Sequence, residues 1–187
     1  MSDEPKEPEG VVEHNQGEAG GDEAFWGAVV PRIIGSIEHH LGPGDLAQLR
    51  RMRVDQPGCP AFWKIVSEDL AGALPSGELA RCLAEERWAT ILRTFAELSG
   101  MNSPRTDLGT ALAKAEFSEV RFTRLLRARN GMLDDAVRGA SRILASKGQA
   151  SRLVDFAALV LLQDDPGGER VRRRLARSYY AKPKTRS

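Results

Sequence analysis

The sequence predicts an all-α protein of about eight helices in two packed lobes, with no sheet. Apolar residues recur every three or four positions through most of the chain from residue 24 to residue 181, which is the spacing of one helix face. No segment alternates polar and apolar residues over a useful length, so no strand is expected. Stretches containing glycine and proline separate the periodic segments and mark where helices end.

An N-terminal lobe is expected over residues 23–100. Its first helix runs from about Ala24 to Leu41, Pro31 is placed to interrupt or bend it, and Gly42-Pro-Gly44 ends it. Further helices are predicted at about Leu46–Met52, Ala61–Ala71 and Gly77–Ser99. The inward stripe of the longest helix is predicted to consist of Leu79, Leu83, Ile91, Phe95 and Leu98, with Trp88 beside it.

A C-terminal lobe is expected over residues 101–181, after a break at Met101–Arg105 that contains Pro104. Gly131 and Gly148 lie where two of its helices are predicted to end. Its predicted helices are at about Asp107–Glu116, Ser118–Arg129, Leu133–Lys147, Arg152–Gln163 and Glu169–Ala181.

The net charge of +1, from 27 Lys and Arg against 26 Asp and Glu, hides a strong segregation of charge. Residues 1–23 hold eight acids and one base, whereas the other 164 residues hold 26 bases and 18 acids. Residues 1–22 have almost no large apolar side chains and are predicted to be a disordered acidic tail, and residues 182–187 a short basic tail. This asymmetry is typical of proteins with a polyanionic partner, and we hypothesise that the acidic tail screens the basic surface.

The residues that catalysis or metal binding would need are missing or badly spaced. His39 and His40 are adjacent, so on a helix their side chains diverge by about 100°, unlike the i, i+4 pair of a zinc site. The acid pairs Asp134-Asp135 and Asp164-Asp165 are expected to serve a helix start and a turn. We therefore expect no enzyme, no cofactor and no metal.

The remaining composition indicates a soluble protein of the cytoplasm. Cys59 and Cys82 make no disulfide framework and are expected to be reduced and buried. The longest aliphatic run, Phe156–Leu162, is far shorter than the roughly 20 residues of a membrane span. The acidic, polar N-terminus is unlike a signal peptide, so no membrane partner is expected.

Arginine forms two coherent helix faces. Arg121, Arg124 and Arg127 recur at three-residue intervals and span about 120° of one helix, opposite Phe122 and Leu125, and Glu119 alone cannot neutralise them. The last helix repeats the pattern, since from Arg170 onward the sequence holds eight bases and no acid. We predict a nucleic-acid-binding surface made of Arg50, Arg51, Arg53, Arg121, Arg124, Arg127, Arg142, Lys147, Arg170, Arg173, Arg174 and Arg177.

Arginine outnumbers lysine by 21 to 6. The planar guanidinium suits bidentate phosphate contacts, which give salt-dependent affinity without reading the base sequence. Aromatic platforms are few, with Tyr179, Tyr180 and Trp63 as the candidates, so base stacking is expected to be secondary.

Several short motifs resemble the CasB family, the small subunit of the type I-E CRISPR surveillance complex called Cascade. The likeness covers roughly residues 24–180. The motifs are Ala47-Gln-Leu-Arg-Arg-Met52, Pro60-Ala-Phe-Trp-Lys-Ile-Val66, Leu108-Gly-Thr-Ala-Leu-Ala113, Arg121-Phe-Thr-Arg-Leu-Leu-Arg127 and Arg142-Ile-Leu144.

The resemblance implies a two-lobed helical protein that is not an enzyme. Its partners would be the large, backbone and RNA-processing subunits of Cascade and a second copy of itself. It would help to hold the R-loop, through the crRNA and the target and non-target DNA strands. By position, Arg50, Arg51, Arg121, Arg127 and Arg142 match basic positions of the family, and we hypothesise that the Arg50–Arg51 pair and the Arg121–Arg127 face line one groove.

Two other classes of function stay open from the residues alone. A stand-alone DNA-binding regulator would place a helix in the major groove, but the arginine faces lack Asn or Gln at base-reading positions. A structural adaptor would dock its basic faces on acidic protein surfaces. A footprint with sequence preference would support the regulator, and binding that survives nuclease treatment would support the adaptor.

Overall fold

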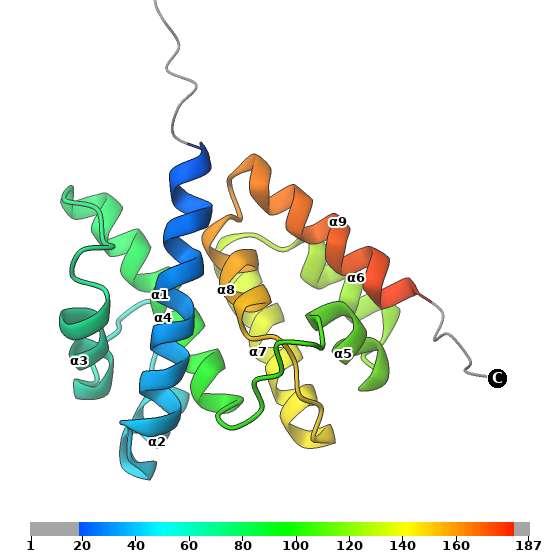
Figure 1. The fold of residues 1–187 in the computed structure, drawn as a ribbon, viewed down its shortest axis with the longest axis horizontal. Coiled ribbons are helices and arrows are strands. Elements are labelled where there is room, and N and C mark those ends of the chain that lie inside the picture. The colour runs from blue at the N-terminus through cyan, green and yellow to red at the C-terminus, as the bar shows by residue number, and fades with distance from the viewer. Residues whose placement is uncertain (1–18, 182–187) are drawn as a thin grey trace, which may run out of the picture.

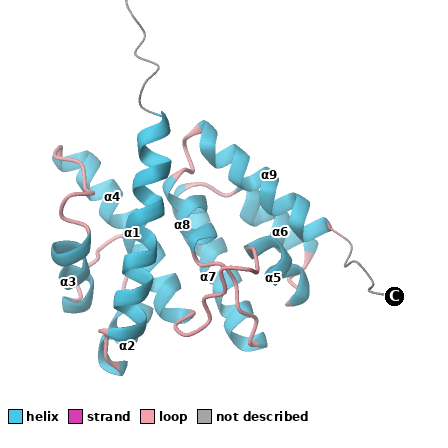
Figure 2. Ribbon diagram, viewed as in Figure 1, coloured by secondary structure: helices cyan, strands magenta, loops and turns pink. Residues whose placement is uncertain are grey.

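The computed structural model describes residues 19–181, and side chains from residue 27 onward. Within these residues the chain consists of helices joined by loops, as Figures 1 and 2 show. One isolated parallel bridge between Asn102 and Ser151 is the sole strand-like pairing of the described part. The predicted all-α class is confirmed. The helices are α1 (Ala19–His39), α2 (Pro43–Arg51), α3 (Pro60–Asp69), α4 (Glu78–Glu97), α5 (Leu108–Lys114), α6 (Glu119–Arg127), α7 (Asn130–Lys147), α8 (Val154–Leu161) and α9 (Pro166–Tyr180).

Helix α1 differs from the sequence prediction in its start and in its continuity. Helix α1 begins at Ala19, inside the predicted acidic tail, and the rest of that tail lies outside the described residues, as does the basic tail 182–187. The helix is also continuous through Pro31. Pro31 has no backbone N–H, so the carbonyl of Gly27 loses its partner within the helix. Both residues are exposed, so water can donate a hydrogen bond to that carbonyl.

Gly131 does not end a helix, because α7 begins one residue before it, at Asn130. Gly148 does end α7, with a left-handed φ of 61°.

Helix α4 is the centre of the hydrophobic core and packs against α2, α7 and α8. Trp88, Ile91 and Phe95 have no exposed surface, which confirms the inner part of the predicted stripe. The outer part of that prediction was wrong, because Leu79 is 76% and Leu83 is 49% exposed. The apolar periodicity of the α4 sequence therefore extends about two turns beyond the part of the helix that is buried in the core.

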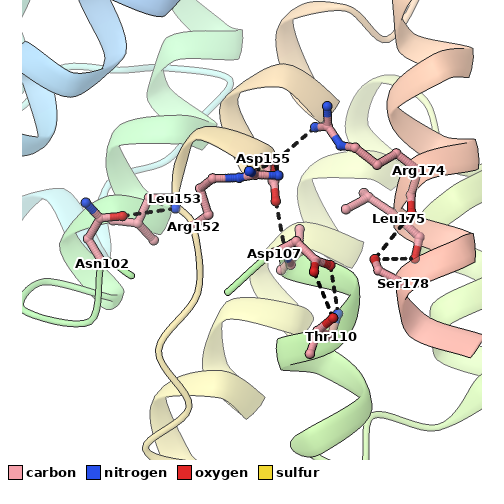
Figure 3. A network of polar contacts seen from close by, with 10 residues as sticks. Asn102, Asp107, Thr110, Arg152, Leu153, Asp155, Arg174, Leu175 and Ser178 are labelled. Atoms are coloured by element: carbon pink, nitrogen blue, oxygen red, sulfur yellow. Dashed lines mark hydrogen bonds and ion pairs between the residues drawn. The ribbon is translucent and has the colours of Figure 1, made fainter. Parts of the chain in front are cut away.

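A buried carboxylate joins three helices of the C-terminal half (Figure 3). Asp155, on α8, has no exposed side-chain surface. Its Oδ2 accepts a hydrogen bond from the backbone N–H of Leu108 at 3.0 Å, at the start of α5. Its Oδ1 lies 3.0 Å from a guanidinium nitrogen of Arg152 and 2.9 Å from one of Arg174 on α9. One side chain thus fixes α5, α8 and α9 relative to one another.

Helices α5 and α9 approach closely because α5 carries a glycine at their contact. A Cβ on Gly109 would lie 2.3 Å from the carbonyl oxygen of Leu175 and 2.9 Å from the backbone nitrogen of Tyr179. Backbone atoms of α9 cannot move aside, so only glycine fits there. This contact gives a physical reason for the glycine in the Leu108–Ala113 motif.

The Asp155 network makes a prediction about stability. Asp155→Asn should lower the free energy of unfolding by about 2–3 kcal/mol, because the neutral carboxamide loses the charge attraction to Arg152 and Arg174 and keeps one acceptor oxygen where the carboxylate uses both. Urea unfolding followed by circular dichroism measures it. Glu169→Gln is the control, since its exposed i, i+4 pair with Arg173 should contribute about 0.5 kcal/mol or less. Equal losses in the two variants would contradict the central role of Asp155.

Candidate nucleic-acid interface

Helix α6 presents a row of three exposed arginines, Arg121, Arg124 and Arg127, called here the α6 arginine row. Phe122 and Leu125 point inward from the same helix and are fully buried. Among the side chains of residues 27–181, no acid forms an ion pair with any of the three guanidiniums. The row is therefore a concentration of positive charge that the described part of the chain leaves unneutralised.

The one acid on α6, Glu119, is engaged elsewhere. Its carboxylate accepts a hydrogen bond of 2.9 Å from the hydroxyl of Tyr180, at the end of α9. This bond holds the phenol protonated and raises the pKa of Tyr180. Glu119 thus links α6 to α9 and does not neutralise the row.

Aromatic packing fixes the orientation of α6. The rings of Phe122 and Tyr179 stack with centroids 3.8 Å apart and 9° between their planes, and the Tyr179 hydroxyl donates to the carbonyl of Phe117. Burial raises the pKa of Tyr179. The prediction that Tyr179 offers a free stacking platform was therefore wrong, whereas Tyr180 and Trp63 remain 53% and 42% exposed.

A hollow of about 600 Å³ lies beside the α6 arginine row, between α6 and α7. The three arginines and Asp135 supply its polar lining. The other lining residues are apolar or small, and they are Phe117, Ala128, Met132, Ala136 and Gly139. We call this feature the α6–α7 hollow.

The arginines of α2 and the following loop have internal contacts. Arg50 donates from Nε to the carbonyl of Ala96 at 2.9 Å, which satisfies an acceptor at the C-terminal end of α4. Arg51 donates to the carbonyl of Ala47 within its own helix at 3.1 Å. Arg53 forms an exposed ion pair of 2.6 Å with Asp55, which raises the pKa of Arg53 through a hydrogen bond and charge attraction.

Arg51 and Arg53 line a different groove from the α6 arginine row. This groove has a volume of about 670 Å³ and lies between the loop after α2 and helices α4, α7 and α8, and Arg138 of α7 also lines it. The hypothesis that the α2 arginines and the α6 row share one groove was wrong, because the two hollows have only Asp135 in common. The groove also contains the acids Asp55, Glu86 and Asp134, so its charge is mixed.

The predicted bases of α7 and α9 fall into two groups. Arg142 and Arg177 are exposed, and within the described residues neither side chain has a hydrogen-bond or ion-pair partner. Three other bases have acidic partners. Lys147 lies 3.1 Å from Glu116, and Arg173 lies 3.0 Å from Glu169. Arg174 is bonded to Asp155. Arg170 is exposed and also has an interaction within the chain.

Two buried arginines show what the sequence patterns missed. Arg93 is 7% exposed and pairs with Asp134, whose carboxylate also accepts from Thr90 at 3.0 Å. Arg172 is 5% exposed, and burial lowers its pKa. The position of Arg93 inside the apolar stretch Trp88–Ala96 was the available signal that it is buried.

The prediction that Asp134 and Asp135 serve a helix start was wrong, because α7 begins at Asn130 and has no acid in its first turn. The pair Asp164-Asp165 does lie in the turn before α9, as predicted. Besides the contacts of Asp134, Asp165 caps α9 by accepting a hydrogen bond of 2.6 Å from the backbone of Gly167, and Asp164 lies 2.6 Å from Arg87. No group of three or more His, Cys, Asp or Glu among the side chains described, those of residues 27–181, is arranged to hold a metal. None of the helices described here is long and apolar enough to cross a membrane. Both cysteines are free thiols, and Cys82 is exposed, contrary to the prediction that it is buried.

Comparison with known proteins assigns the chain to a family. The model of the family described as CRISPR-associated protein Cse2 matches residues 45–180, a range that contains every predicted nucleic-acid-binding residue. A search of curated proteins finds no match. The crystal structure of CasB from Thermobifida fusca has a similar fold, with a TM-score of 0.61 and 22% identity over 84% of this chain and 97% of that one. The chain belongs to the CRISPR-associated Cse2 family, the CasB family of type I-E Cascade subunits that its sequence motifs resemble.

Proposed function

We propose that this chain is the non-catalytic small subunit of a type I-E Cascade complex, and that its α6 arginine row stabilises the R-loop by contacting nucleic-acid phosphates. The observation that carries the proposal is the row itself. Its three guanidiniums are exposed and have no acid partner within the described residues.

The energetics of α6 support this role. Like charges three positions apart on a helix destabilise it by a few tenths of a kcal/mol per pair. The packing of Phe122 on Tyr179 offsets that cost and holds the row outward. Phosphate groups would neutralise the row, so its charge is better explained by an anionic partner than by folding.

A surface that ignores base sequence suits the task. In RNA-guided complexes, base pairing reads the sequence, and replacing the DNA duplex by the RNA–DNA heteroduplex is nearly balanced in free energy. A few backbone contacts are then enough to favour the open state. Arginine provides such contacts through its planar fork.

The other predicted bases take secondary parts in this proposal. Arg142 and Arg177 are available in the same way as the row, whereas Arg50 and Arg174 serve mainly to hold helices together. The proposed partners are the large, backbone and RNA-processing subunits, the crRNA, the target and non-target strands and a second copy of this chain, in the cytoplasm.

The proposal predicts a defect confined to nucleic-acid retention. Changing Arg121, Arg124 and Arg127 together to Ala should weaken target-DNA retention by the assembled complex about 10- to 100-fold, if each contact contributes about 0.5–1 kcal/mol. The slope of log affinity against log salt should fall by roughly 2–3, since each phosphate contact contributes about 0.7–0.9. Dissociation of labelled target DNA across a salt series measures both.

A matched control removes the same charge elsewhere. Lys64, Arg81 and Arg105 are exposed and lie outside the α6–α7 hollow, so their triple Ala variant should retain target DNA almost as the parent does. The thermal stability of the row variant should equal or slightly exceed that of the parent, because like-charge repulsion is relieved. Unchanged retention in a properly assembled complex would remove the row from the nucleic-acid surface.

A further inference from the structure

The α6–α7 hollow has a lining that phosphate binding alone does not require. A phosphate surface needs only the exposed arginines, yet here they border a lining of apolar or small residues. Met132 in that lining is 71% exposed, and Ala136 and Gly139 follow it on α7 at helical spacing. The volume of about 600 Å³ is within the range of cavities that take a small organic ligand.

Gly139 keeps part of the hollow open. It lies in the middle of α7, where glycine is less favourable to a helix than alanine. No contact among the described residues requires it, because a Cβ built there would meet no atom within 4 Å. A larger side chain at this position would reduce the hollow that Gly139 lines, so the glycine leaves room for a ligand from outside the described part of the chain.

A nucleic-acid duplex would use only the charged part of this surface. The phosphates of a duplex lie outside, but its base faces are stacked inside and cannot reach an apolar lining. A single strand exposes the flat face of a base next to each phosphate. Proteins that bind such strands combine basic side chains for the phosphates with side chains that pack on the bases, and the hollow offers both within one cavity.

The side chains of the hollow can hold a base in two ways. The guanidinium plane of an arginine in the α6 arginine row can stack on a base, with cation–π attraction. The thioether of Met132 is polarisable and makes favourable contacts with aromatic rings. Because Met132 is exposed beside the row, a base can contact both groups at once.

The other large groove is a poorer match for a nucleotide. The groove lined by Arg51 and Arg53 also contains the acids Asp55, Glu86, Asp134 and Asp135. The α6–α7 hollow contains Asp135 as its single acid against three arginines. Electrostatics therefore favours the hollow as the site for a phosphate-bearing ligand.

We propose that the α6–α7 hollow is a nucleobase site, in which one unpaired base lies against Met132 while the phosphates on either side of it contact the α6 arginine row. The inference rests on the function proposed above and specifies the ligand of the row as a strand with unpaired bases. The phosphate contacts weaken as salt rises, whereas the apolar contact with the base does not.

The first test compares two strands that carry the same number of phosphates. The full chain is titrated with an oligothymidylate of about eight nucleotides and with the same strand in which tetrahydrofuran abasic units replace every base. The parent should bind the oligothymidylate about 5- to 30-fold more tightly, because one held base contributes about as much as one stacked base. Equal affinity for the two strands would overturn the proposal.

Two glycines of α7 provide matched variants. Gly139→Leu fills the hollow without changing its charge, so it should reduce the preference for the oligothymidylate to less than about 2-fold while the affinity for the abasic strand stays unchanged. Gly131→Leu adds the same side chain in the other groove, where a Cβ also meets no atom within 4 Å, and should keep the preference of the parent. An equal preference in the two variants would contradict a base in the α6–α7 hollow.

Met132 gives a direct readout in the parent protein. The chain has four methionines, so ¹³C-methyl labelling gives a simple spectrum in which the buried Met52 serves as an internal control. The ring current of a bound thymine should shift the Met132 methyl signal, whereas the abasic strand should leave it nearly in place. Equal shifts with the two strands would overturn the proposal.

The outcomes separate this inference from the function on which it rests. Equal affinity for the two strands, with target-DNA retention lost in the row variant, would remove the base site and leave the function standing. A clear preference for the oligothymidylate with unchanged retention would support the base site and count against the function proposed for the row. Impaired assembly of the complex in Gly139→Leu, with oligonucleotide binding unchanged, would assign the hollow to a protein partner and overturn the proposal.

Discussion

The buried carboxylate of Asp155 is the interaction on which the C-terminal half of the structure depends. It bonds the first turn of α5 and the side chain of Arg174 on α9 from a position inside α8. Fixing α9 also fixes Tyr179, whose ring stacks on Phe122 and thereby orients α6. The outward direction of the α6 arginine row follows from a chain of contacts that begins at this one side chain.

The arginines of this protein divide into two populations with different physical roles. Arg50, Arg93 and Arg174 hold helices together, bonded to a helix-end carbonyl or to an acid that is half-buried or buried. The α6 row has no such partner among the described residues and lies beside an apolar hollow. The number of Lys and Arg residues therefore overstates the basic surface available to a polyanion, because several of these side chains are bonded within the chain. The bases without such partners are the ones that a polyanion can contact.

The fold class and most helices could be predicted because apolar periodicity and glycine or proline breaks are local signals. The α6 row was predicted for the same reason, since Arg121, Arg124 and Arg127 share one face of one helix. What depends on tertiary contacts could not be read from the sequence. Three such features follow from how the helices pack. They are the exposure of Leu79, the hydrogen bond from Arg50 to α4, and the separate hollows that the arginines of α2 and α6 line.

The function proposed here requires the α6 arginine row to contact nucleic acid in the assembled complex. Ultraviolet cross-linking of Cascade bound to target DNA, followed by mass spectrometry of the small subunit, tests it most directly. Cross-linked nucleotides are expected on residues in or beside α6, within about Phe117–Met132. Cross-links found only on other elements of the chain, in a complex that holds the R-loop, would contradict it.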